Sequence, residues 1–294
     1  MSFGARLGIA FMRSLAHVPL PLVRGFGAAL GPMLYVLARP RRRVVDANLA
    51  LCFPEKSAAE RRRIARETFV YVAQSWLDRS WLWHAPKAVV ASRLKIKGDP
   101  GDVHEVTHGD KPLILFAPHF YGLDAAATAL TMRSPRVCTT IYTTQRNPMM
   151  DEWVSEGRRR FGNVSTLNRV DGIKPIVAAL RQGGVLYLLP DMDFGRDQTV
   201  FVPFYGVQAA TMPSLSRFAR LGRAKVMPVI SRLVEGGYEI EVLPAWQDFP
   251  TDDVIADTAL MNQRLQGYID DMPSQYYWVH RRFKTRPVGE APVY

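Results

Sequence analysis

The stretch that decides the fold is Leu113-Ile114-Leu115-Phe116-Ala117-Pro118-His119-Phe120-Tyr121-Gly122-Leu123-Asp124. It opens with five apolar residues that follow Pro112 and precede a polar turn, which is the pattern of a buried strand. His119 would then lie at the carboxyl end of that strand. Open α/β sheets bind their ligands at this edge, so the stretch predicts both a strand and a site.

Asp124 falls early in a helix that the sequence predicts from Leu123 to Met132. From there a carboxylate can fold back and hold one imidazole nitrogen of His119, which leaves the other nitrogen free to accept a proton. The stretch offers no protein nucleophile. We therefore interpret His119 and Asp124 as a base and its orienting carboxylate, acting on a hydroxyl of the substrate. A structural, hydrogen-bonded histidine remains the alternative that this stretch alone leaves open.

Strands and helices alternate after residue 112. Strands are expected at 113–117, 137–142, 185–189, 200–202, 225–231 and 238–243, and helices at 123–132, 148–161, 171–181, 213–221 and 257–272. Such alternation is typical of an α/β fold with a mixed, largely parallel sheet that is covered by helices on both faces.

Composition narrows the class of protein. The 294 residues are 48% hydrophobic, enough for a full core, and two cysteines do not form a disulfide framework, so a reducing compartment is expected. A formal charge of +11 favours acidic partners such as an anionic membrane or an acidic protein. The sequence has no zinc finger, RNA-binding aromatic signature or basic heptad array, so nucleic acid is not an expected partner.

The first 43 residues are apolar but interrupted by arginines and prolines. We expect two amphipathic helices, 3–17 and 22–38, that lie in a membrane interface, because no stretch is a clear spanning helix. The basic run Arg39 to Arg43 favours an anionic cytoplasmic leaflet. The predicted division is therefore a membrane-associating segment, 1–43, and a catalytic domain, 44–294. A helical hairpin that merely covers the core is the alternative.

His104-Glu105-Val106-Thr107-His108 matches a zinc-protease pattern, which requires a long helix that carries both histidines on one face. Pro100-Gly101 before it and Gly109-Asp110 after it leave room for barely two turns. We expect a short capped surface helix here, no metal site, and no cofactor.

Several blocks together resemble the bacterial lipid A biosynthesis acyltransferases, in which a His-x-x-x-x-Asp/Glu motif is catalytic. The matching blocks are Asn48-Leu49 with Leu51-Cys52-Phe53-Pro54-Glu55, then His119 to Asp124, Pro190 to Asp193, Val200 to Gly206 with Ala210-Thr211, and Gln275 to Pro287. They span roughly residues 44 to 288.

The resemblance implies a glycerolipid-acyltransferase-like fold and an O-acyltransferase activity that uses His119 and Asp124. It also implies functional roles for Arg158 and Asp191. Arg158 would bind an acceptor phosphate or carboxylate, or the oxyanion, because its planar fork suits such groups. Asp191 follows the strand at 185–189 and would converge on the same cleft as His119. Arg146, after the strand at 137–142, is a further substrate-binding candidate.

The first hypothesis is transfer of a fatty acyl chain from acyl-acyl carrier protein to a hydroxyl of a Kdo-bearing lipid A precursor, at the cytoplasmic face of the inner membrane. Arg281, Arg282 and Lys284 would meet the acidic headgroup or the carrier protein. One rival is a glycerolipid or other glycolipid O-acyltransferase of the same superfamily. A rival of a different class is a non-catalytic, basic membrane-binding protein.

Overall fold

A seven-stranded sheet organises the computed structural model, which describes residues 3–168 and 172–294. The strand order is β1-β9-β8-β2-β5-β3-β4. The strands are β1 (Leu94–Lys97), β2 (Leu113–Phe116), β3 (Val137–Tyr142), β4 (Asn163–Asn168), β5 (Val185–Leu188), β8 (Lys225–Val234) and β9 (Gly237–Val242). Within this sheet the β8–β9 pair is antiparallel and the other neighbours pair in parallel. The mixed, largely parallel sheet expected from the sequence is therefore confirmed.

Alternating side chains of β2 feed two hydrophobic cores, one on each face of the sheet. Leu113 and Leu115 pack in the core that α7 (Leu123–Thr131) and α8 (Pro148–Arg158) cover. Ile114 and Phe116 pack in the opposite core. That core is covered by α9 (Lys174–Arg181), α10 (Ser214–Gly222) and α11 (Val254–Asp270). Because β2 is buried on both sides, its continuous apolar run is explained.

The remaining elements are short. They are α5 (Lys87–Ser92), α6 (Pro100–His108), a 3₁₀ turn (Pro273–Gln275) and the antiparallel hairpin of β6 (Val200–Phe204) and β7 (Val207–Thr211). Helix α6 is the short helix predicted around His104 and His108, and Asp99 caps it. The helix predicted at 171–181 begins at Lys174, and the predicted start at residue 171 lies outside the described residues.

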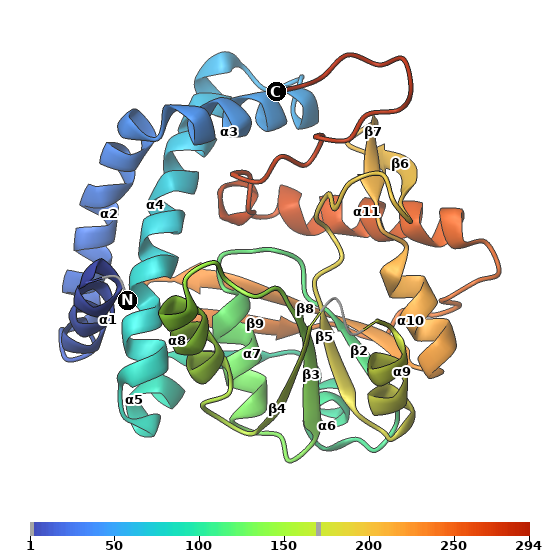
Figure 1. Cartoon of the computed structure of the whole chain (residues 1–294), viewed down its shortest axis with the longest axis horizontal. Helices are drawn as coiled ribbons and strands as arrows, with labels where there is room; N and C mark the ends of the chain where they lie inside the picture. Colours follow the sequence, from blue (N-terminus) through green and yellow to red (C-terminus); the bar gives the residue numbers. More distant parts are fainter. Residues whose placement is uncertain (1–2, 169–171) are drawn as a thin grey trace.

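The first four helices of the described chain form one side of the molecule (Figure 1). They are α1 (Phe3–Leu15), α2 (Leu20–Leu37), α3 (Arg39–Cys52) and the long α4 (Ala58–His84), which begins with a capping box formed by Ser57 and Glu60. Both α1 and α2 pack against α4. The two predicted N-terminal helices therefore exist, with bounds that differ by a few residues.

Helix α2 is held unusually close to α4. A Cβ on Gly31 would lie 2.6 Å from the Cα of Val70, so only glycine permits this approach. Arg24 of α2 is buried and forms an ion pair with buried Asp78 of α4 at 2.9 Å. By length and composition α2 could also cross a membrane, although 28% of its span is buried inside the structure. A core helix of a soluble protein passes the same test.

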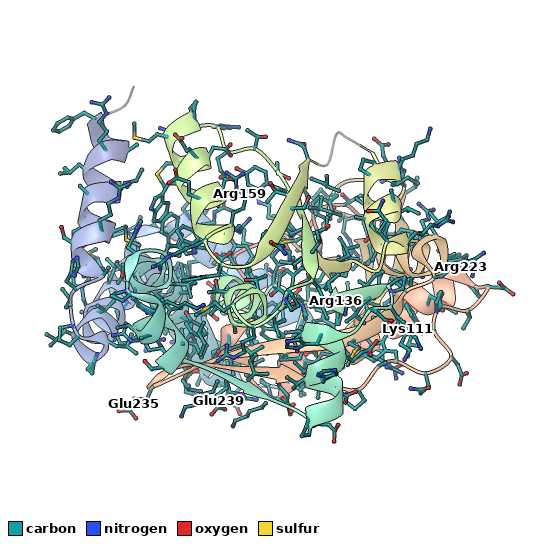
Figure 2. All side chains as sticks on the ribbon, turned by 90° about the horizontal axis from the view of Figure 1, so that it is seen from below. Lys111, Arg136, Arg159, Arg223, Glu235 and Glu239 are labelled. Atoms are coloured by element: carbon teal, nitrogen blue, oxygen red, sulfur yellow. The ribbon has the colours of Figure 1, made fainter. Side chains whose placement is uncertain are left out.

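The amino ends of the strands are tied together by Arg136, which precedes β3. Its guanidinium donates to the backbone oxygens of Glu105, Lys111 and Gly183, at the end of α6 and at the entries to β2 and β5. Figure 2, a view from below, shows Arg136 close to Lys111. The Arg136 side chain therefore bridges the sheet at the amino ends of its strands. The predicted site lies at the other end, where the strands have their carboxyl ends.

Candidate active site

His119 and Asp191 meet because the strands that precede them are paired in register. β2 and β5 are parallel neighbours, and Phe116 at the end of β2 lies opposite Leu188 at the end of β5. His119 and Asp191 each follow three residues after these paired positions. As a result the imidazole Nδ1 of His119 lies 2.7 Å from Oδ1 of Asp191.

The Asp191 carboxylate is buried and accepts from three donors. Oδ1 faces Nδ1 of His119, while Oδ2 accepts from the backbone N–H of His119 at 2.9 Å and from the hydroxyl of Tyr276 at 3.0 Å. Burial alone would raise the pKa of Asp191, but the His119 imidazole and these hydrogen bonds hold the pKa below its usual value. Asp191 is therefore a carboxylate, and a carboxylate can only accept.

The protonation pattern of the His119 ring follows from this contact. Because Asp191 only accepts, Nδ1 carries the ring proton and Nε2 of the neutral imidazole is left with its lone pair. Within residues 3–168 and 172–294, no hydrogen bond of Nε2 is recorded, and 19% of the side chain is exposed. A base with an accessible Nε2 and a fixed tautomer is the arrangement required to take a proton from a bound hydroxyl.

Asp124 does not hold this ring, which corrects the contact expected from the sequence. Its Oδ2 accepts from Nε and Nη2 of Arg79 at 3.0 and 2.8 Å, and its Oδ1 accepts from Nε of Arg158 at 2.9 Å. Burial would raise the pKa of Asp124, but Arg158 and Arg79 lower it to about 2. The local spacing predicted a contact between Asp124 and His119, but two arginines from other helices bind the carboxylate instead.

The C-terminal block quoted above forms one wall of the site. Phe120 and Tyr276 form an antiparallel bridge, Tyr277 N–H donates to the carbonyl of His119 at 3.0 Å, and Tyr121 N–H donates to the carbonyl of Gln275 at 3.1 Å. These bonds fix the backbone on both sides of His119. The block therefore positions His119 and also supplies the Tyr276 hydroxyl to Asp191.

His280 is a second histidine of this block and is uncharged. Its Nε2 accepts from the backbone N–H of Asp193 at 3.0 Å, so that nitrogen has no proton. Burial, together with the nearby His119 and Arg282, lowers the pKa of His280 to about 4. Buried Asn48 of α3 donates to the carbonyls of Trp278 and His280 at 2.7 and 2.8 Å, which holds the block against the N-terminal helices.

The other predicted residues divide between the site and the surface. Arg158 joins Asp124, as described, whereas Arg146 lies on the exposed loop between β3 and α8, and no bond of its side chain to the described site residues is recorded. Arg282 is not available to a headgroup, because it is buried and donates to the carbonyl of Ala210 and the hydroxyl of Thr211. This corrects its expected surface role.

Two further groups bear on the chemistry. Burial raises the pKa of both thiols, that of Cys138 to about 12, so neither cysteine is a ready nucleophile.

The His104 and His108 rings stack with their centroids 5.3 Å apart. The part of the chain that the structure describes contains no group of three or more His, Cys, Asp or Glu side chains able to hold a metal ion.

Sequence reasoning missed Arg79 and Tyr276 as members of the site. Arg79 lies in the second half of a long helix, between Asp78 and Ser80, and no local pattern distinguishes it. Tyr276 lies within the distinctive final block, so a signal was present, but its partner is set by the fold.

Comparison with known proteins identifies the family. The family model described as bacterial lipid A biosynthesis acyltransferase matches residues 1–285. The chain is 32% identical over 291 residues to the lipid A biosynthesis lauroyltransferase of Escherichia coli (strain K12), covering 98% of this chain and 94% of that protein. It is 31% identical over 295 residues to the lipid A biosynthesis myristoyltransferase of the same organism, covering 99% and 90%.

A solved structure is also similar, at a greater distance. The 1-acyl-sn-glycerophosphate acyltransferase of Thermotoga maritima aligns with a TM-score of 0.41 at 12% identity, covering 86% of this chain and 97% of that one. This likeness is too distant to support a conclusion. The family match and the relatives are sufficient: the chain belongs to the bacterial lipid A biosynthesis acyltransferase family and is an acyltransferase of lipopolysaccharide biosynthesis.

Proposed function

We propose that the protein transfers a fatty acyl chain from acyl-acyl carrier protein to a hydroxyl of a Kdo-bearing lipid A precursor. His119 is the general base of this reaction. The observation that carries this proposal is the 2.7 Å contact between Nδ1 of His119 and the buried Asp191 carboxylate, which places the ring proton of the neutral imidazole on Nδ1 and leaves the lone pair on Nε2. Asp191 thus takes the orienting role that the sequence had suggested for Asp124.

The reaction moves one proton from the acceptor hydroxyl to His119 and then to the leaving thiolate. Nε2 removes the proton of the acceptor hydroxyl as its oxygen attacks the thioester carbonyl, and Asp191 stabilises the imidazolium that forms. The tetrahedral intermediate then expels the carrier thiolate, and the thiolate accepts the proton from Nε2. An ester and a free carrier thiol result. The thioester is already a reactive donor, so this route needs no covalent protein intermediate, in keeping with the raised pKa values of the two cysteines.

The charge of the chain supports the partners. Acyl carrier protein, a phosphorylated glycolipid and an anionic membrane are all acidic, and the chain carries a formal charge of +11. The relatives named above act in lipid A biosynthesis, which favours the lipid A acceptor over a glycerolipid.

The N-terminal helices support contact with a membrane, and the basic run Arg39 to Arg43 favours the anionic cytoplasmic leaflet of the inner membrane. One face of α1 and α2 exposes large apolar side chains; they include Phe3, Leu7, Phe11, Leu22, Phe26, Met33, Val36 and Leu37. An exposed apolar surface of this kind on a helix is typical of an interfacial membrane contact. We propose that this face lies on the membrane while the opposite face of α2 stays packed on α4.

Labelled acyl-acyl carrier protein offered to a panel of acceptors tests the function. The wild-type protein should acylate the Kdo-bearing lipid A precursor in preference to glycerolipids, and His119→Ala should reduce the rate at least about 10²-fold. His104→Ala is the matched control, because His104 is exposed on α6, and it should leave the rate unchanged. Near-normal turnover by a folded His119→Ala variant would refute the mechanism. A wild-type protein that acylates no acceptor would favour the non-catalytic reading.

A further inference from the structure

Asp124 holds two arginines that come from different helices. Arg79 belongs to α4 and Arg158 to the end of α8, while Asp124 stands in the first turn of α7. The carboxylate is buried, and the three hydrogen bonds given above use both of its oxygens. The cluster therefore has two positive charges against one negative charge, and it is cationic as a whole.

Three terminal nitrogens of the two arginines are unused within the described residues: Nη1 of Arg79 and both terminal nitrogens of Arg158. Arg79 uses Nε and Nη2 for Asp124, and Arg158 uses Nε alone. For Nη1 of Arg79 and both terminal nitrogens of Arg158, no bond to any residue within 3–168 or 172–294 is recorded. Their side chains are 22% and 29% exposed, so the cluster is open to solvent on one side. Guanidinium groups with free terminal N–H donors suit an oxyanion.

The surroundings of Arg79 make this a built site. Its guanidinium lies over the rings of Trp76 and Trp83, 4.8 and 5.4 Å from their centroids, and these contacts fix the side chain. Trp83 in turn lies against α8, where a Cβ on Gly157 would come within 2.3 Å of the ring. Glycine beside Arg158 thus lets α8 approach α4 closely enough for both arginines to reach one carboxylate.

The neighbourhood also suits an amphiphilic ligand. Trp76 is 48% exposed, and α1 with its exposed apolar face packs against both α4 and α8. An anionic headgroup at the arginines would leave its acyl chains beside this apolar surface. The cluster stands at the start of α7, on the connection that carries His119, so a headgroup bound there would be delivered to the base.

We propose that Arg79 and Arg158 form an anion subsite for the phosphate or sugar-acid carboxylate of the glycolipid acceptor, with Asp124 as the positioning residue. This inference rests on the proposed function and adds Arg79 to the binding machinery. It also gives Asp124 a role other than orienting His119: the carboxylate holds the two guanidinium groups beside each other and leaves Nη1 of Arg79 and both terminal nitrogens of Arg158 for a ligand. It stabilises two like charges that would otherwise repel each other.

Steady-state kinetics with saturating acyl-acyl carrier protein test the subsite. Arg79→Gln should raise the KM for the lipid A precursor about 10-fold or more, equivalent to about 1.4 kcal/mol. The kcat should change less than about threefold and the KM for the donor should not change. Arg79→Lys should lie between, because lysine keeps the charge and loses the fork. Arg159→Gln removes the same charge from the exposed neighbour of Arg158 and should have no effect (Figure 2).

Two acceptor analogues identify the anion. With a precursor that lacks its phosphates, or with one that lacks its Kdo sugars, the Arg79→Gln effect should vanish in the arm that removes the bound group. An effect that persists in both arms, or that appears in the KM for the donor, would overturn the proposal. If Arg79→Gln does not fold, Arg158→Gln decides by the same two criteria.

The outcomes separate this inference from the proposed function. If the wild-type protein transfers acyl chains in a His119-dependent manner but neither arginine variant alters the acceptor KM, the subsite is wrong and the function stands. If His119→Ala is fully active, the mechanism fails whatever the arginine variants do.

Discussion

Asp191→Asn would change the tautomer of His119. The carboxylate offers two oxygens to three donors, and Asn keeps only one oxygen. That oxygen can serve the two donors at Oδ2, the backbone N–H of His119 and the Tyr276 hydroxyl. The amide NH₂ then faces Nδ1, which must accept a hydrogen bond instead of donating one. The ring proton moves to Nε2, the nitrogen that would have to receive the proton of the acceptor.

The magnitude follows from the loss of the base. A positioned general base contributes about 10²–10⁴-fold, and the Asp-to-Asn exchange in a serine-protease triad costs about 10⁴ in kcat for the same tautomeric reason. We expect kcat to fall by about 10²–10⁴-fold, which corresponds to about 2.7–5.4 kcal/mol of activation free energy.

Tyr276→Phe is the matched control for this prediction. It removes one donor to the same carboxylate, keeps the charge of Asp191 and leaves the tautomer unchanged. Its main cost should be stability, about 1.5–3 kcal/mol for a hydrogen bond to a charged group, with kcat within about tenfold of wild type. The assays are kcat with labelled donor and nitrogen NMR of labelled histidine. An Asp191→Asn variant with a normal rate, or with the proton still on Nδ1, would refute the reasoning.

Three further predictions test the packing and the proposed membrane face. His280 has a pKa of about 4 against an ordinary value of 6.5, so the unfolded chain binds the His280 proton before the native state does as the pH falls, and the native state loses stability in this pH range. The His280→Gln variant should therefore show a smaller change of melting temperature between pH 6.5 and about 4 than the wild-type protein. Gly31→Ala should cost about 1–3 kcal/mol in urea unfolding because its Cβ meets the α4 backbone, whereas Gly25→Ala, with nothing within 4 Å, should not destabilise. Exchanging exposed Phe3 and Leu7 for Ser should release the protein from anionic vesicles at high salt without lowering its melting temperature; unchanged sedimentation would remove α1 from the membrane face.

The buried strands could be predicted, and the edge strands could not. β2 and β5 are buried at every position, so each is a continuous apolar run in the sequence. β4 is an edge strand with the sequence Asn-Val-Ser-Thr-Leu-Asn and is only partly buried. β1 is the other edge strand, and in its sequence Leu-Lys-Ile-Lys the apolar residues alternate with lysines. Edge strands need fewer apolar residues, so their pattern is weak.

The site was predictable as a set of positions but not as a set of contacts. His119 and Asp191 each follow a buried strand, which is a local signal. That the ring chooses Asp191 over Asp124 depends on which strands are neighbours and on their register, and neither is local in sequence. The pairing of Asp124 with Arg79 needs α4, α7 and α8 to be docked, a fact that no spacing rule contains.

The paired ends of β2 and β5 set a constraint on chain length. Ala117-Pro118 leads from β2 to His119, and Leu189-Pro190 leads from β5 to Asp191, so two connections of equal length each place a proline directly before the residue that forms the contact. Proline fixes φ, which makes both connections stiff. Deleting one residue from either connection would shift its end by about 3.3 Å, more than the 2.7 Å hydrogen bond it must span. Such a deletion in one connection alone should separate the His119 ring from the Asp191 carboxylate. Matched deletions in both connections would move the two residues by the same distance and keep them opposite each other.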